Sequence, residues 1–183
     1  MEDSAFALTT DLLLPERPLT LGIYLVADGM GGHDNGEVAS RIAIQVSVNS
    51  LMQSLILPIL QGELLPSHQE VSNLVEAAFT QAQEQVLRTV SGGGTTLTLA
   101  LLLEKHLYFG HIGDSRLYMR SDHADFQPLT QDHSLVRRLV DLGQLSEAEA
   151  AHHPQRNVLF RALGQTEGFK VDLGHVDLVE PTQ

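Results

Sequence analysis

The sequence has 183 residues, a length that suits one domain with a core of its own. It contains no cysteine, which excludes a disulfide framework, thiolate-bound zinc, iron–sulfur clusters and a cysteine nucleophile. Asp and Glu number 23 against 11 Lys and Arg, for a formal net charge of −12. The basic residues form no patch, so nucleic acid is not an expected partner.

The N-terminus carries Glu2 and Asp3 where a secretory signal would carry positive charge. We therefore expect a cytoplasmic location. The most apolar stretch, residues 42–60, is interrupted by six polar residues and a proline, too many for a lipid-spanning segment. We expect it to form a buried helix.

The first predicted elements are a strand and a helix. Residues 21–27 form a short apolar run with β-branched and aromatic members, which predicts a buried strand that ends at a glycine-rich loop. Asp34 and Glu37 have the spacing of a capping box. The helical periodicity that follows, from Val38 to about Leu60, predicts a long helix.

A second capping box, Ser67 with Glu70, predicts another amphipathic helix that ends near the glycines at 92–94. The period then changes to that of strands. Short joints predict that the three following strands are antiparallel neighbours, the first of them central; these strands are residues 95–103, 106–112 and 116–120.

The last third of the chain shows helices followed by extended segments. Residues 133–142 predict a helix that ends at Gly143, and Ser146 with Glu149 caps a short one. Residues 158–163 are expected to be extended or irregular, and the alternation in 169–179 predicts strands. Antiparallel strands before and after a pair of helices indicate an α+β layered fold.

Three loops carry most of the chemical information. Asp28 ends the first predicted strand and is followed by three glycines within four residues, a setting that suits a hard cation such as Mg²⁺ or Mn²⁺. Asp114 stands at a second turn. Each aspartate alone could merely shape its turn. Residues 93–96 could cradle an anion or simply let backbones approach, and they lack the lysine of a P-loop.

The order and spacing of six motifs are more specific than any one of them. The chain reads ED, VADGMGGHDNGEVAS, GGTTL, YFGHIGDSRLYM, LTQDHSLVRRLVDLGQLS and VLFRALG, in that order. This series resembles the type 2C (PPM) metal-dependent serine/threonine protein phosphatases, most closely their bacterial branch. The resemblance covers nearly the whole chain.

The resemblance implies roles for five residues near the start and middle of the chain. Asp28 matches the aspartate that bridges two catalytic metal ions, and Gly29 matches the glycine whose carbonyl ligates one of them. Glu2 matches the acid that reaches the metal shell through water, with Asp3 beside it. Asp114 matches the aspartate of the GDSR turn, which supports a third metal in bacterial members.

The implied fold is a two-sheet antiparallel β-sandwich flanked by helix pairs. We expect residues 1–183 to form one phosphatase-like catalytic domain, with a variable flap at about 132–153 beside the site. The family's upstream arginine and its later S-D-G and D-N motifs are missing from the sequence. The domain is therefore expected to be truncated at both ends and its sandwich to be incomplete at the C-terminus.

The implied activity is hydrolysis of phosphoserine and phosphothreonine in proteins by a metal-activated water, with two or three Mn or Mg ions as cofactors. The expected partner is a phosphorylated protein, paired with a serine/threonine kinase. Because part of the metal shell is missing, a phosphatase-like module that binds or regulates a phosphoprotein without hydrolysis is the alternative.

Histidines and arginines complete the set of candidates. Asp28 and His33 are the candidate catalytic residues, with His33 placed to donate a proton or a hydrogen bond near phosphate, or else to support the loop. His111 is expected in the core, and the pair at 152–153 in a solvated flap. Arg116 is expected to form a structural ion pair with Asp114 or a nearby carboxylate. The residues that bind phosphate are not identified.

Overall fold

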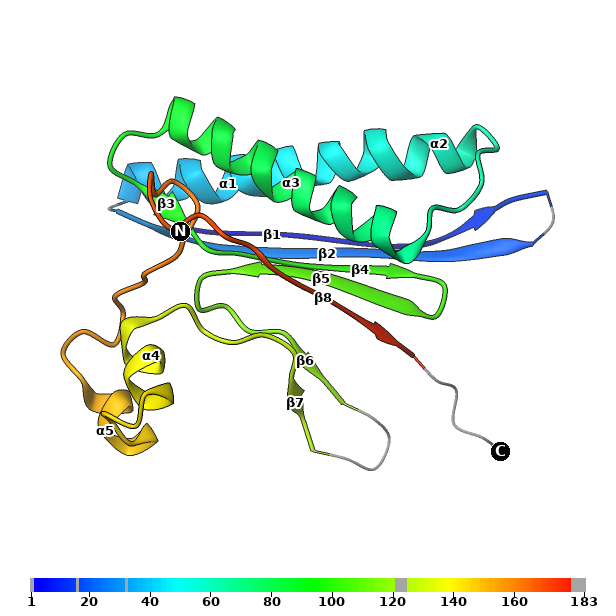
Figure 1. The fold of residues 1–183 in the computed structure, drawn as a ribbon. Helices are drawn as coiled ribbons and strands as arrows, with labels where there is room; N and C mark the ends of the chain where they lie inside the picture. The colour runs from blue at the N-terminus through cyan, green and yellow to red at the C-terminus, as the bar shows by residue number, and fades with distance from the viewer. Residues whose placement is uncertain (1, 16, 32, 121–124, 179–183) are drawn as a thin grey trace.

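In the computed structural model of the chain, residues 2–15, 17–31, 33–120 and 125–178 are described, without the side chains of residues 33 and 34. The main feature is an antiparallel sheet (Figure 1). Its strands lie in the order β1 (Asp3–Leu13), β2 (Pro18–Met30), β4 (Leu97–Leu103), β5 (His106–Ile112) and β8 (Asp172–Asp177), and the short β3 (Gly94–Thr95) pairs with the end of β2.

Two long helices cover one face of this sheet (Figure 1). They are α1 (His33–Leu51), which continues through the π-helical turn η1 (Met52–Ile56) into α2 (Leu57–Leu60), and α3 (His68–Thr89). Phe79 of α3 is buried so close to β5 that a Cβ on Gly110 would lie 2.5 Å from its ring. The core therefore lies between the helix pair and the centre of the sheet.

The smaller elements lie on the other side of the sheet (Figure 1). The strands β6 (Tyr118–Met119) and β7 (Gln127–Pro128) form a two-stranded antiparallel sheet. They are followed by the helices α4 (Leu135–Asp141) and α5 (Glu147–His152). This half of the molecule holds the predicted flap.

The α+β class, the antiparallel strands and the helix pair confirm the predicted fold class. The predicted capping boxes are both present, formed by Ser67 with Glu70 and by Ser146 with Glu149. The apolar stretch from Asn35 to Leu60 is long enough to cross a membrane. Its buried side chains belong to the core with the sheet and α3, which is the packing expected of a core helix.

α1 begins at His33, one residue before Asp34, and the Asp34 side chain on which the predicted capping box depends lies outside the described part of the structure. The strand β1 was not predicted at all. Its side chains alternate between exposed and half-buried positions, so it presents no continuous apolar run. Register with β2, which pairs Asp3 with Asp28, holds it in place along its whole length.

The predicted hairpin between residues 106–112 and 116–120 is also wrong. β5 pairs with β4 and β8, whereas β6 pairs only with β7 among the described strands. The chain turns at Gly113, whose φ of 115° is a backbone angle that glycine adopts readily and other residues rarely adopt. Beyond it, the hydroxyl of Thr98 lies 3.2 Å from the Ser115 carbonyl oxygen, which holds the turn over β4 instead of along β5.

Candidate metal centre

The first acidic loop gains its neighbours from the pairing of β1 with β2. Asp3 lies opposite Asp28 in the register, and the N–H of Gly29 donates to the Glu2 carbonyl at 3.2 Å. The hydroxyl of Ser40 on α1 donates to the same carbonyl at 2.6 Å. Strand β2 and helix α1 thus fix the backbone of Glu2 and Asp3 beside the end of β2.

Asp28 is fixed through its own backbone. Its N–H donates to Thr96 Oγ1 at 2.9 Å, and its carbonyl accepts from the Thr96 N–H at 2.9 Å and from Thr95 Oγ1 at 2.9 Å. Thr96 Oγ1 also lies 2.9 Å from Ser115 Oγ, next to Asp114. Thr96 therefore joins the two acidic loops that the sequence singled out, a role that its place in GGTTL did not reveal.

Glycine is required where α1 meets the end of β2. A Cβ on Gly29 would lie 2.2 Å from the Gly36 carbonyl oxygen and 2.6 Å from that of Glu2. A Cβ on Gly36 would lie 3.1 Å from Glu2 Oε2. The bare backbones let the first turn of α1, the end of β2 and the Glu2 side chain meet. Residues 94–95 form β3 and pair with the end of β2. The glycine turn at residues 93–96 therefore lets the two backbones approach closely.

The acidic side chains of this region lie close enough to repel one another. The pKa of Asp28 is raised by burial first, and then by the charge of Asp3 and a hydrogen bond with it, with smaller contributions from Asp114 and Glu2. The carboxylates of Glu2, of Asp3 on β1 and of Asp114 after β5 are therefore near enough to act on Asp28 at the end of β2. This places together all the acids that the resemblance named.

Asp114 has a second carboxylate beside it. Its pKa is raised by burial and then by the charge of Asp132, while Arg116 acts in the opposite direction. Arg116 donates to both oxygens of Asp132, Nε to Oδ1 and Nη2 to Oδ2, each at 2.7 Å. Arg116 thus forms its expected structural ion pair with Asp132. The carboxylate of Asp114 therefore belongs to the acidic site instead.

The donor set suits a hard divalent cation. The side-chain donors brought together, from Glu2, Asp3, Asp28 and Asp114, are all carboxylate oxygens, the ligands that Mg²⁺ and Mn²⁺ prefer. Their mutual repulsion would be relieved by positive charge placed among them. His33 begins α1 near this loop, but its side chain lies outside the described part of the structure.

Two buried histidines, His111 and His133, lie next to the loop that carries Asp114. The N–H of Gly113 donates to His133 Nδ1 at 3.1 Å, and the N–H of His133 donates to the Gly113 carbonyl at 2.7 Å. His111 is fully buried, and burial together with the nearby His133 lowers its pKa to about 4. The expected core role of His111 is confirmed, whereas the positioning role of His133 was missed.

Residues of the predicted flap line an open groove together with Asp114. The groove has a volume of about 310 Å³, and Asp114, Arg116 and Asp132 are among its lining residues. Arg137, Glu147 and Arg156 from the region of α4 and α5 are also among its lining residues. The histidines at 152 and 153 are exposed or half-exposed, and the ring of His152 lies 3.0 Å from the local Ala148 carbonyl.

Comparison with known proteins agrees with this geometry. The family model "Protein phosphatase 2C" matches residues 17–165. A serine/threonine phosphatase (stp) of Listeria monocytogenes is 31% identical over 156 residues, covering 82% of this chain and 58% of its own length. Protein phosphatase PhpP of Streptococcus pneumoniae is 33% identical over 158 residues, covering 85% of this chain and 61% of its own. The chain thus spans little more than half of these relatives.

Solved structures show the same fold. The serine/threonine phosphatase of S. agalactiae aligns with a TM-score of 0.75 and 26% identity, over 97% of this chain and 76% of that one. The catalytic domain of the phosphatase PstP, in complex with two manganese ions, aligns with a TM-score of 0.67 and 27% identity, over 97% and 73%. By the match of its sequence and of its fold, the chain belongs to the protein phosphatase 2C family.

Proposed function

We propose that this chain forms the metal-binding portion of a metal-dependent protein-serine/threonine phosphatase. The observation that supports the proposal most is that sheet register and backbone hydrogen bonds bring Glu2, Asp3 and the Asp114 loop beside Asp28, whose pKa the acidic neighbours raise. The family and the named activities of the bacterial relatives support the same reaction. The expected substrates are phosphoserine and phosphothreonine in proteins, with a serine/threonine kinase as the opposing enzyme.

We assign the ligands as the resemblance implies them. Asp28 would be shared between two divalent cations, with the Gly29 carbonyl on one of them and Asp114 on a third. Glu2 and Asp3 would complete the acidic wall of the site. Two manganese ions in the PstP structure support manganese or magnesium as the metal. When bound, such ions lower the pKa of a nearby water and neutralise phosphoryl oxygens.

The chain's own residues would hold these groups in place for the reaction. Thr96 fixes the backbone of Asp28, and His133 fixes Gly113 ahead of Asp114. In the reaction, the oxygen of water bonds to phosphorus, the bond from phosphorus to the serine or threonine oxygen breaks, and that oxygen leaves with a proton. Without cations, the acidic site and the net charge of −12 would repel a phosphorylated substrate.

The test compares two proteins, the chain as printed and a fusion that appends the C-terminal part of the Listeria phosphatase. Each is assayed for phosphate release from a phosphothreonine peptide with Mn²⁺, with Mg²⁺ and with EDTA. We expect metal-dependent release by the fusion, and its loss in the fusion with Asp28→Asn. Metal-dependent binding of the peptide with no release by a folded fusion would instead establish the alternative, a module that binds phosphoproteins without hydrolysis.

A further inference from the structure

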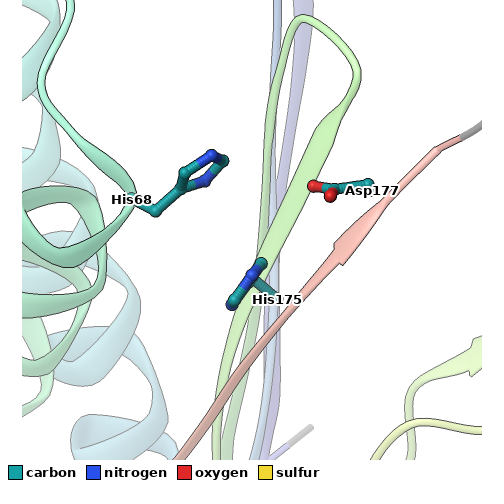
Figure 2. Close-up of side chains that lie close together, drawn as sticks. All are labelled: His68, His175 and Asp177. Carbon is teal, nitrogen blue, oxygen red and sulfur yellow. The ribbon is translucent and has the colours of Figure 1, made fainter.

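A second group of metal-ligating side chains lies far from the acidic site. His68 is the first residue of α3, and His175 and Asp177 stand on the edge strand β8. Figure 2 shows the three side chains pointing toward one another across the gap between the helix and the strand. All three are exposed, and one ligand atom from each lies within 4.8 Å of the others.

The position of this group within the sheet separates it from the acidic site. His106, which pairs with Asp177, begins β5, whereas Asp114 follows the other end of that strand. At about 3.3 Å per residue, the ends of β5 are roughly 20 Å apart. The two groups of ligands are therefore distinct.

The sheet register explains why these side chains meet. His106 pairs with Asp177, and Tyr108 pairs with His175. Side chains two residues apart share a face of a strand, and Gly110 on the same face of β5 lies against Phe79 of α3. All four side chains therefore stand on the helix-covered face.

The helix supplies the third ligand at a defined place. The capping box formed by Ser67 and Glu70 fixes the residue at which α3 begins. His68 follows the cap directly, and its ring centroid lies 5.4 Å from that of His175 and 4.6 Å from that of His106. The start of the helix is thus held over the edge of the sheet.

Two hydrogen bonds orient the ligands and leave them free to bind. Nδ1 of His106 lies 2.7 Å from Asp177 Oδ1, which leaves Oδ2 available. The Tyr108 hydroxyl lies 2.6 Å from His68 Nδ1, which leaves Nε2 available. Metal-binding histidines and carboxylates commonly have such outer partners.

We propose that His68, His175 and Asp177 form a binding site for a borderline divalent cation, with Zn²⁺ as the expected ion. Two imidazoles and one carboxylate suit Zn²⁺, whereas Mg²⁺ prefers the all-oxygen set of the acidic site. Tetrahedral zinc with bonds of about 2.0–2.1 Å places its ligand atoms about 3.4 Å apart. The ligand atoms lie within 4.8 Å of one another, and rotation of the three exposed side chains would bring them to this separation.

The bound ion would join the start of α3 to the edge of the sheet. His68 lies more than a hundred residues before the other two ligands, His175 and Asp177, in the chain. Three protein ligands leave a fourth position for water or a further group. The site is independent of the phosphatase proposal, because none of its ligands belongs to the acidic centre.

The test is calorimetric titration of Zn²⁺ into the full 183-residue chain carrying Asp28→Asn, in excess Mg²⁺, so that the acidic centre does not contribute. Three further proteins add His175→Gln, Asp177→Asn or, as a matched control, His152→Gln on the exposed face of α5. Circular dichroism establishes that each variant is folded. Imidazole NMR signals report which histidines meet the ion.

We expect one equivalent of Zn²⁺ to bind, with its affinity reduced at least about tenfold by His175→Gln and by Asp177→Asn. The control should bind as the parent does, and the His68 and His175 signals should shift on binding. The proposal is overturned if the parent binds no Zn²⁺, or if the folded His175 and Asp177 variants bind it as tightly as the control. The cluster would then be a hydrogen-bonded network only.

Discussion

Acidic neighbours repel the charged form of the Asp28 side chain, while hydrogen bonds hold its backbone in place. Burial and its acidic neighbours raise its pKa, so its charged form is less favourable in the folded chain than in the unfolded one. A carboxyl of this kind contributes most to stability below its unfolded pKa, and that contribution is lost as the pH rises through its folded pKa. At neutral pH, the cation-free chain therefore carries a penalty.

We predict that Asp28→Asn stabilises the metal-free chain at pH 7. Because burial of Asp28 is only partial and its side chain still contacts water, solvent screening limits the gain to about 0.5 kcal/mol, or a rise in Tm of about 1–2 °C. Thermal unfolding in EDTA measures it. The exposed Asp125→Asn serves as the control and should leave Tm unchanged. A lower Tm for Asp28→Asn would mean that its neighbours do not repel it.

His111 makes the second prediction at this scale. Its pKa of about 4 lies below the 6.5 of a free imidazole, because burial and His133 disfavour its charged form. The unfolded chain therefore binds an extra proton between pH 6.5 and 4, and stability is lost as the pH falls through that window. The shift corresponds to a loss of about 3 kcal/mol. Urea unfolding across this range should show a smaller loss for a folded His111→Gln variant; an equal loss would contradict the assignment.

At the scale of elements, the metal centre depends on hydrogen bonds between strand ends and loops. Thr96 contacts both the Asp28 backbone and Ser115, so it links β2 to the Asp114 loop. We predict that Thr96→Val costs about 1–3 kcal/mol, because a backbone N–H is left without its acceptor. Tm should fall by about 3–10 °C, and Mn²⁺ affinity should fall with it.

The matched control is Thr80→Val on the exposed side of α3, where the hydroxyl donates to the local Glu76 carbonyl at 3.1 Å. It should change stability by less than about 0.5 kcal/mol. Thermal unfolding and Mn²⁺ titration of both variants measure the difference. Equal behaviour of the two would mean that Thr96 does not hold the loops together.

The sequence predicted those elements whose local signals agree with their packing. The run at 21–27 and the capping box at Ser67 correspond to β2 and α3, because burial and capping are local properties. β1 was missed because its half-buried residues gain their partners only from β2. The predicted pairing of β6 with β5 was wrong because Gly113 and Thr98 turn the chain away from β5. This turn depends on tertiary contacts.

The site was predictable to a similar degree. Asp28 and Asp114 stood out as acids in glycine-containing turns, but only the resemblance to the phosphatases brought them together. Thr96 and His133 were missed because their roles are hydrogen bonds to backbone groups distant in the chain. The His68 cluster was missed because a helix start and an edge strand meet there only in the folded molecule.

At the scale of the whole molecule, the sheet face opposite α1 and α3 exposes apolar side chains. Tyr24 and Val26 are 38% and 46% exposed, and with their register partners Ala7 and Ala5 and with Leu117 they line an open groove of about 560 Å³. Exposed apolar patches of this kind favour association. The 183-residue chain therefore has a surface that favours self-association.

We predict that the chain self-associates as its concentration rises, and that Val26→Thr reduces the association several-fold while the fold is retained. Sedimentation velocity at a series of concentrations measures it. Leu64→Thr, which alters a residue that is 94% exposed in the connection before α3, is the control and should associate as the parent does. A parent that stays monomeric throughout would show that this face does not drive association.

The central claim is that Asp28 and Asp114, 86 positions apart in the chain, hold the same group of divalent cations. Mn²⁺ binding followed by electron paramagnetic resonance tests it most directly, with the full chain, Asp28→Asn, Asp114→Asn and the control Asp125→Asn. We predict that each of the first two substitutions weakens Mn²⁺ binding at least about tenfold, while Asp125→Asn leaves it unchanged. Equal binding by all four proteins would contradict the account.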